Sequence, residues 1–275
     1  MLFRSHHLDW FAKEVMADRR YADAMIAGDR ERLLALGKAR FAQIGETFGI
    51  SHWYFITPDR KVLLRMHEPG LHGDLTNRQT LLAAERTGEP ATGSELGATA
   101  TLTLRHVRPW RVDGRLIGYV EMGTEIEWVA RRIQELIGGE VFTAVHKAYT
   151  SPEDFATGKH ALRLTGDWDT YPDFVLLGQT MDHLPPLLEL VWQAVVAGAK
   201  PDVFSVAEGS RRWSGIIVPL ADYQGRSVAS MALLRDLGPA AATRNRHVAA
   251  ALIAAAALGS LMFLALAWRI GRIES

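Results

Sequence analysis

The spacing of hydrophobic residues changes early in the chain, and this change separates a helical beginning from a strand-rich remainder. Residues 1–48 keep a helical repeat, as at Phe41 and Ile44, and predict a long N-terminal helix that can break at Gly28. From His52 onward, apolar and polar residues alternate over short runs bounded by turn residues, which is typical of half-buried strands. The pattern therefore predicts a helical stalk followed by sheets.

Strands and helices are intermixed in two successive units, which predicts the α+β class. The first unit has the strand segments HWYFIT, KVLLRMHEP, TATLTLRHV and RLIGYVEMG, and the short helix TNRQTLLAAERTG. The second runs from about Gly139 to Leu237 and has VFTAVHKAY, the helix LPPLLELVWQAVVAG, and the strands WSGIIVPL and RSVASMALL. We expect EIEWVARRIQELI to be the helix that connects the two units.

The two units end in the same way, which favours a duplicated module. PWRVDGRLIGYVEM, from Pro109, aligns with PLADYQGRSVASMAL, from Pro219, and each places a turn and Gly-Arg before an apolar strand. Asp113-Gly114 in the first copy is a dipeptide favoured in hairpin turns. We expect a helical stalk and two modules with antiparallel sheets, at residues 1–48, 49–137 and 138–240.

Near the C-terminus lies an uncharged run of membrane-spanning length. Residues 248–268 read VAAALIAAAALGSLMFLALAW, and roughly 20 apolar residues at about 1.5 Å each cross a hydrocarbon core of about 30 Å. Arginines flank both ends, and Trp268 stands where an interfacial aromatic belongs. We expect a transmembrane helix here. Because residues 1–20 are charged and resemble no signal peptide, we also expect a misassigned start or a trimmed reading frame.

Composition and motifs exclude several classes of function. Lysine plus arginine number 31 and aspartate plus glutamate also number 31, so the chain lacks the basic excess of a nucleic-acid binder. It contains no cysteine, which excludes disulfides, thiolate metal sites and a cysteine nucleophile. It has no glycine-rich phosphate loop, no nucleophile elbow and no histidine pair with zinc-site spacing. We expect neither an enzyme nor a cofactor.

Two predicted strands each carry cationic side chains on one face. In LLRMHEP, Arg65 and His67 share a face because side chains alternate along a strand, and in TATLTLRHV, Arg105 lies opposite Leu102 and Leu104. If the strands are neighbours, these three residues could converge on one anion, since guanidinium groups donate paired hydrogen bonds to carboxylates. The alternative is the ordinary solvated face of an antiparallel sheet, which also carries Arg, His and Thr.

Three further residues are candidates for the same site. Tyr54, in the first strand, could reach the pocket, although buried tyrosines are also common in cores. Asp74 lies between the two strands and could cap a turn. Arg78 is either a pocket residue or a solvated charge on the short helix.

The segments HWYFITPDRKVLLRMHEPGLHGD, ERTGEPATGSELGATATLTLRHVRPW and DGRLIGYVEMGTEI follow one another in the chain and resemble the double Cache sensory domains of two-component kinases and chemoreceptors. The resemblance is good over residues 20–135 and looser beyond. It implies membrane-distal and membrane-proximal PAS-like modules outside the cytoplasm, flanked by two membrane spans, with residues 269–275 starting a cytoplasmic linker. It also implies an inner-membrane location, and we expect a homodimer.

The first module is also similar, more distantly, to the periplasmic domains of citrate and C4-dicarboxylate sensor kinases. Those domains bring an Arg and a His from one strand, and an Arg from a later strand, to the ligand carboxylates, and Arg65, His67 and Arg105 match in order. One residue separates Arg65 from His67, where those sensors usually have two. Aligning Pro219 with Pro109 puts Gly215 at the position of Arg105, so we expect the second module to transmit rather than bind.

The sequence thus predicts the extracytoplasmic ligand-sensing domain of a transmembrane signalling receptor, with a small carboxylate or other small anion bound in the first module. The main alternative is a membrane-anchored structural or partner-binding Cache domain that takes no small molecule. A membrane-bound enzyme is a third and more distant alternative.

Overall fold

The computed structural model describes residues 2–97, 99–162, 164, 166–200, 202–208 and 211–237, and the chain divides into two compact units. The N-terminal unit comprises Phe3–Glu95 and Thr103–Glu125, and the C-terminal unit comprises Leu96–Leu102 and the chain from Ile126. The predicted transmembrane helix and linker, at 248–268 and 269–275, lie outside the described residues. Within the part of the chain that is described, every helix is too short or too polar to cross a bilayer.

The N-terminal segment forms three helices, so the prediction of one long helix is wrong. They are α1 (Leu2–Ala17), α2 (Arg19–Ala27) and α3 (Arg30–Phe48). Asp18 starts α2, because its side chain accepts a hydrogen bond from the backbone N–H of Arg20. Gly28 ends α2 in the left-handed conformation, with φ of 65°, and Asp29 caps α3. The break at Gly28 follows the sequence prediction, whereas the one at Asp18 was not foreseen.

The N-terminal unit is built on a five-stranded sheet with the order β2-β1-β5-β4-β3. Its elements are β1 (His52–Ile56), β2 (Val62–Arg65), α4 (Gln79–Thr87), β3 (Ala91–Leu96), β4 (Leu102–Val112) and β5 (Arg115–Glu125). The pairs β1–β2, β1–β5 and β4–β5 are antiparallel. Asp113 and Gly114 join β4 to β5 with φ of 50° and 79°, as the hairpin prediction requires.

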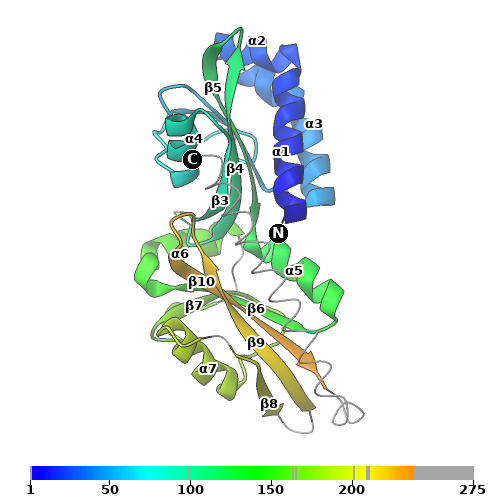
Figure 1. Ribbon diagram of the computed structural model, residues 1–275, viewed down its shortest axis with the longest axis vertical. Coiled ribbons are helices and arrows are strands. Elements are labelled where there is room, and N and C mark those ends of the chain that lie inside the picture. Colours follow the sequence, from blue (N-terminus) through cyan, green and yellow to red (C-terminus); the bar gives the residue numbers. More distant parts are fainter. Residues whose placement is uncertain are drawn as a thin grey trace. The chain divides into compact units, whose positions relative to one another are not determined.

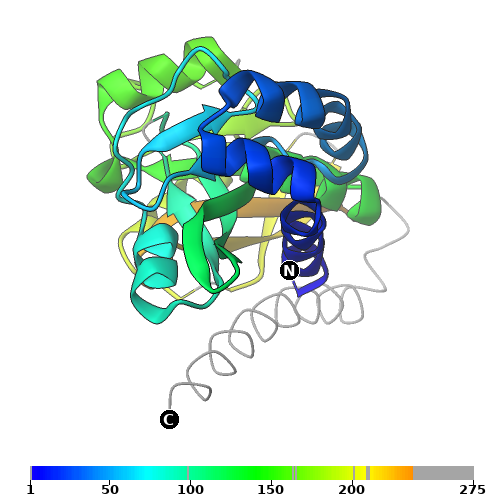
Figure 2. The ribbon, with the colours of Figure 1, turned by 90° about the horizontal axis from the view of Figure 1, so that it is seen from above.

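Helices cover both faces of this sheet (Figures 1 and 2). The helices α1, α2 and α3 lie on one side, where Leu8, Phe11 and Leu33 join Trp53 and Met122 of the sheet in one buried apolar cluster. The helix α4 lies on the other side (Figure 1). Apolar burial against α1–α3 therefore fixes one face of β1, β4 and β5, and strand alternation turns the next residues toward the α4 side.

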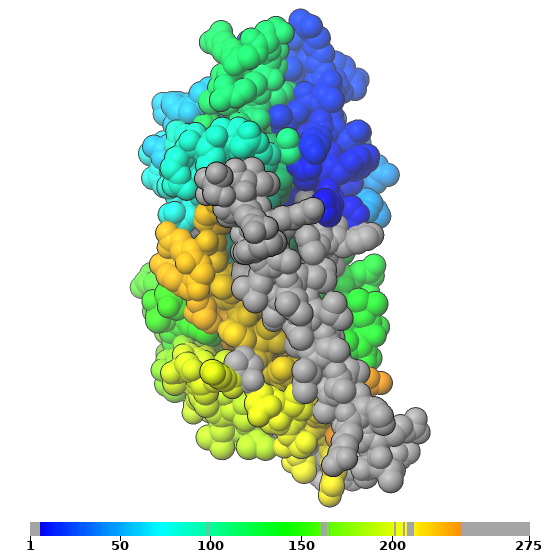
Figure 3. Space-filling model, in the orientation of Figure 1, coloured from blue at the N-terminus to red at the C-terminus, as the bar shows by residue number. Residues whose placement is uncertain are grey.

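The turn of the β4–β5 hairpin lies beside α2, as the green and blue ribbons of Figure 1 and the green and blue atoms of Figure 3 show. Gly118 of β5 makes this close approach, since a side-chain carbon there would collide with the Ile56 carbonyl and the Met25 methyl group. Its φ of 148° also falls in a region that other residues rarely adopt.

The C-terminal unit repeats the same sheet, with the order β7-β6-β10-β9-β8. Its elements are α5 (Ile126–Ile137), β6 (Glu140–His146), a 3₁₀ turn (Lys147–Tyr149), α6 (Pro152–Leu162), β7 (Phe174–Gln179), α7 (Pro186–Val196), β8 (Phe204–Glu208), β9 (Arg211–Ala221) and β10 (Ser227–Asp236). With β6 taken as a first strand, the order is identical to that of the N-terminal sheet. Two separate antiparallel sheets were predicted, and two are found.

Candidate functional site

Charged side chains cluster on the α4 side of the N-terminal sheet. The backbone register sets Arg65 of β2, Tyr54 of β1 and Glu121 of β5 next to one another across three strands. A second row of neighbours lies two residues from the first: His52 of β1 pairs with Gly123 of β5, and Gly123 pairs with Arg105 of β4. Strand alternation brings both rows to the same face.

Three guanidinium groups surround the ring of Tyr54. The Cζ atoms of Arg78, Arg65 and Arg105 lie 4.3, 5.5 and 6.0 Å from the ring centroid. Each distance is within the range of cation–π attraction. Arg78 reaches the ring from the N-cap position of α4, so the helix and the sheet supply cations to the same place.

A single buried carboxylate joins two of these cations. Glu121 is 0% exposed, and its Oε1 lies 2.6 Å from Arg105 Nη1 and 2.8 Å from Arg78 Nη1. Burial alone would raise the pKa of Glu121, but the two guanidinium charges outweigh it and hold that pKa below its ordinary value. The charge of Glu121 in turn holds the pKa of Arg78 above its ordinary value against the effect of burial. Glu121 is therefore ionised.

The third cation is bound by a carboxylate at the surface. Arg65 Nη1 and Nη2 donate to the two carboxylate oxygens of Asp74 at 2.8 and 2.7 Å, and Nη1 also donates to the Leu71 carbonyl. The Arg65 side chain is 12% exposed and that of Asp74 is 51% exposed. The hydrogen bonds from Arg65 lower the pKa of Asp74. The fork geometry is the one that guanidinium groups use to hold carboxylates.

Two neutral imidazoles complete the cluster. The ring of His67 contacts those of His52 and Tyr54 edge-on, at centroid distances of 4.6 and 4.9 Å. Burial, together with the charges of Arg105, Arg65 and Arg78, lowers the pKa of His67 to about 4. Burial lowers the pKa of His52 well below its ordinary value as well. Both rings are therefore uncharged at neutral pH.

Some buried polar atoms of the cluster lack a hydrogen-bond partner among the described residues. They include Nε of Arg105 and Nδ1 of His67. Burying a polar atom without a partner costs free energy, so such atoms mark places where a ligand or water would be stabilised. Among the described residues, His, Asp and Glu side chains form no group of three that could hold a metal ion.

The structure brings the six sequence-predicted residues together on this face. They are Arg65, His67, Arg105, Tyr54, Arg78 and Asp74. The face is not the solvated surface that was the alternative, because Arg105 and Tyr54 are each 4% exposed. Arg78 is mostly buried rather than a solvated helix charge, and Asp74 pairs with Arg65.

Glu121 was missed by the sequence analysis. The signal was a lone acidic residue inside the apolar strand GYVEMG, at a position that alternation puts on the same face as Tyr119 and Gly123. A buried carboxylate needs a cationic partner, so this residue could have predicted that some cation of the cluster is paired within the protein.

The C-terminal unit has no equivalent cluster at the matching register positions that the structure describes. In the backbone register Gly215 pairs with Leu234, just as Arg105 pairs with Gly123 in the N-terminal sheet. Gly215 therefore stands at the position of Arg105, as the alignment of the two repeats predicted. By the same register, Phe142 replaces Tyr54 and Ala232 replaces Glu121. Phe142, Ala232 and Leu234 belong to a buried apolar cluster with Phe174 and Trp192.

Two sheets of identical strand order fit two tandem PAS-like modules. The chain belongs to the double Cache family described as the double sensory domain of two-component sensor kinases, whose family model matches residues 4–163. No curated protein sequence matches the chain. The family is sensory rather than catalytic.

Solved structures of sensory domains are similar to this chain at low sequence identity. They include the periplasmic domain of Vibrio cholerae LuxQ, with 14% identity, a TM-score of 0.48, and coverage of 85% of this chain and 93% of that one. The sensory domain of the Campylobacter jejuni chemoreceptor Tlp3 with isoleucine bound has 14% identity, a TM-score of 0.42 and 85% coverage of each chain. The sensor domain of the V. cholerae histidine kinase DctB has 10% identity, a TM-score of 0.42 and coverage of 81% and 86%.

Proposed function

We propose that this chain is the extracytoplasmic ligand-sensing part of a membrane-anchored signalling receptor, and that its N-terminal unit binds a small carboxylate or similar small anion. The observation that carries the proposal is the arrangement of three guanidinium groups around Tyr54 with only two carboxylates, Glu121 and Asp74, paired to them among the described residues. The three guanidinium groups and the two carboxylates together have a net charge of +1.

The ligand carboxylate is proposed to replace Asp74 on Arg65. Asp74 already fills both oxygen positions opposite the Arg65 fork, and it does so from an exposed loop that follows β2. A ligand carboxylate can form the same two hydrogen bonds if this loop moves outward. Arg65 itself is mostly buried and stays attached to the sheet.

Arg105 is proposed to provide a second contact, deeper in the site. Its Nη1 is bound to Glu121, but its Nε has no partner among the described residues. Burying an anion is costly unless charge and hydrogen bonds compensate, and Arg65 and Arg105 supply both.

His67 is proposed to act as a neutral hydrogen-bonding group. Its lowered pKa means that the imidazole carries one N–H donor and one acceptor nitrogen near neutral pH. Anion affinity should therefore stay nearly flat from about pH 6 to 8, whereas a charged imidazole would make it fall as the pH rises past about 6.5.

The membrane part of the proposal rests on residues 248–268 and on membership of a sensory family. In the complete receptor, we propose that this run crosses the bilayer, that residues 21–240 face the exterior, and that the receptor is a homodimer. Protease added to intact spheroplasts should digest residues 21–240. Complete protection there would refute the topology.

Calorimetry of the chain against a panel of mono-, di- and tricarboxylates tests the site. Arg65→Ala and Arg105→Ala should each weaken binding by about 2–5 kcal/mol, as expected for one partner of a buried charge pair. Arg86→Ala, which removes an exposed arginine from the last turn of α4, is the matched control and should change nothing measurable. Binding that survives both site substitutions would place the pocket elsewhere. No binding to any anion would favour a partner-binding domain.

A further inference from the structure

The C-terminal unit has a cavity of about 450 Å³ between α7 and the strands β8 and β9. The hollow is open to solvent, because Leu190 of its lining is 63% exposed and Ala194 is exposed as well. Its volume falls within the range of small-molecule sites, about 300–1,000 Å³.

The cavity occupies the place that corresponds, in the repeat, to the charged site of the N-terminal unit. The helix α7 lies between β7 and β8 in the chain, as α4 lies between β2 and β3. The cavity residue Ile217 pairs with Ala232, and its counterpart Val107 pairs with Glu121. The same face of the same fold thus has a charged cluster in one unit and an apolar cavity in the other.

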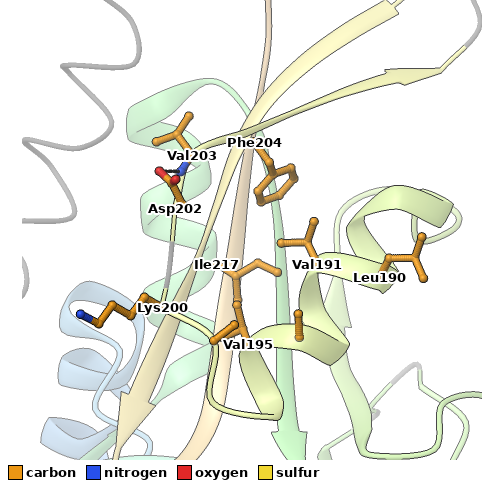
Figure 4. Close-up of a pocket in the computed structure, with 10 residues that line it drawn as sticks. Leu190, Val191, Val195, Lys200, Asp202, Val203, Phe204 and Ile217 are labelled. Carbon is orange, nitrogen blue, oxygen red and sulfur yellow. Dashed lines mark hydrogen bonds between the residues drawn. The ribbon is translucent and has the colours of Figure 1, made fainter.

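The lining of the cavity is apolar. The lining residues include Val191 and Val195 of α7, Phe204 of β8 and Ile217 of β9. In Figure 4, the side chains of Val191, Phe204 and Ile217 face one another across the cavity. Aliphatic and aromatic walls of this kind bind apolar guests, because the guest removes apolar surface from water.

The two charged residues of the lining offer little charge to a ligand. Lys200 extends away from the apolar walls in Figure 4. Asp202 Oδ1 accepts a hydrogen bond from the Val203 N–H at 2.7 Å. The two side chains carry opposite charges, so together they add no net charge to the lining.

We propose that this cavity is a second ligand site, and that it takes a small uncharged apolar molecule, such as one with an aromatic ring or a short hydrocarbon chain. The proposal differs from the expectation that the second module only transmits: the absence of an Arg105 equivalent would change the ligand chemistry of the module rather than abolish binding. The proposal stands independently of anion binding in the N-terminal unit.

Photolabelling with benzophenone, an uncharged two-ring ketone, tests the site on the whole chain, in detergent if needed, because mass spectrometry identifies the labelled residues. We expect saturable labelling confined to residues 187–204 and 213–218. Ala194→Phe, which adds a ring to the cavity lining, should reduce it by about tenfold or more. Ala197→Phe makes the same change three residues later, at the C-cap of α7 and outside the lining, and should leave labelling within about twofold of the original.

Two controls distinguish a specific apolar site from general adsorption of the probe. The anionic analogue 4-benzoylbenzoate should label at least several times less, and equal labelling would overturn the uncharged class of ligand. Arg65→Ala should leave benzophenone labelling unchanged, since Arg65 belongs to the other unit. Labelling that does not saturate, that maps elsewhere, or that responds equally to Ala194→Phe and Ala197→Phe would overturn the site.

Discussion

Arg105 and His106 are consecutive in β4, so their side chains point to opposite faces of the sheet. Each side chain lies beside a carboxylate on its own face. Arg105 Nη1 lies 2.6 Å from Glu121 Oε1 on the α4 side, and His106 Nε2 lies 3.0 Å from Asp9 Oδ1 of α1. One strand therefore links the candidate ligand site to the first helix through two adjacent residues.

Asp9→Asn should weaken this link and lower the free energy of unfolding by about 1–3 kcal/mol at neutral pH, because it leaves buried donors without a charged partner. Asp9 also pairs with Arg108 and Lys13. Burial raises the pKa of Asp9, but the contacts with His106, Lys13 and Arg108 outweigh it and hold that pKa well below its ordinary value. Urea unfolding measures the loss, and hydrogen exchange should become faster in α1 and stay unchanged in α4. The control is Asp23→Asn, whose carboxylate is half exposed; an equal effect of both would contradict the link.

Asp74→Asn should raise the affinity for a small carboxylate. The substitution removes the carboxylate charge of Asp74, which competes with the ligand carboxylate for Arg65, and it keeps the size and shape of the side chain. A gain of about 1.5-fold to fivefold is expected, the equivalent of losing one partly exposed ion pair. Calorimetry with the same ligand panel measures it. A weaker affinity would instead mean that Asp74 contacts a cationic group of the ligand.

Glu121→Gln should destabilise the protein by about 3–5 kcal/mol, because it leaves Arg78 and Arg105 as uncompensated buried charges. Added sulfate or a carboxylate should restore part of the loss if the vacated space accepts an anion. Thermal unfolding with and without sodium sulfate, compared at equal ionic strength with sodium chloride, measures both effects. Glu46→Gln, at an exposed position of α3, is the control. A stable variant without anion dependence would contradict the role assigned to Glu121.

The protein should lose stability as the pH falls from about 6.5 toward 4, and His67 should account for part of the loss. The folded protein holds the pKa of His67 at about 4, whereas an unfolded histidine titrates near 6.5. In this window the unfolded state binds a proton that the folded state does not, so acid favours unfolding. His67→Gln should make the dependence of unfolding free energy on pH less steep. His72→Gln, at an exposed position, should leave the slope as it is.

Strand alternation predicted that Arg65 and His67 share a face, and in the structure both side chains contact the ring of Tyr54. It could not predict which strands are neighbours. β1 and β5 lie between β2 and β4, so Arg65 and Arg105 are not adjacent, and Tyr54 and Glu121 fill the space between them. Sheet order depends on long-range pairing that a local pattern does not contain.

The repeat was the most informative sequence feature of the second half. It predicted the second sheet and the glycine at the position of Arg105, because backbone register follows the alignment of Pro109 with Pro219. It did not reveal the cavity, since apolar residues of α7 and β9 look the same in sequence whether they pack tightly or line an open hollow. The helix start at Asp18 was equally hidden, because one capping residue interrupts an otherwise continuous helical repeat.

In each sheet the two central partners are the first and the last strands of the unit: β1 pairs with β5, and β6 with β10. The middle of each sheet therefore closes only after all the intervening chain has been synthesised. Pairings between distant segments have a high entropic cost and slow the search for the native state. Until β10 has been synthesised, the edge of β6 that pairs with it is exposed and can form hydrogen bonds with incorrect partners. The risk of aggregation should therefore fall only once β10 has left the ribosome.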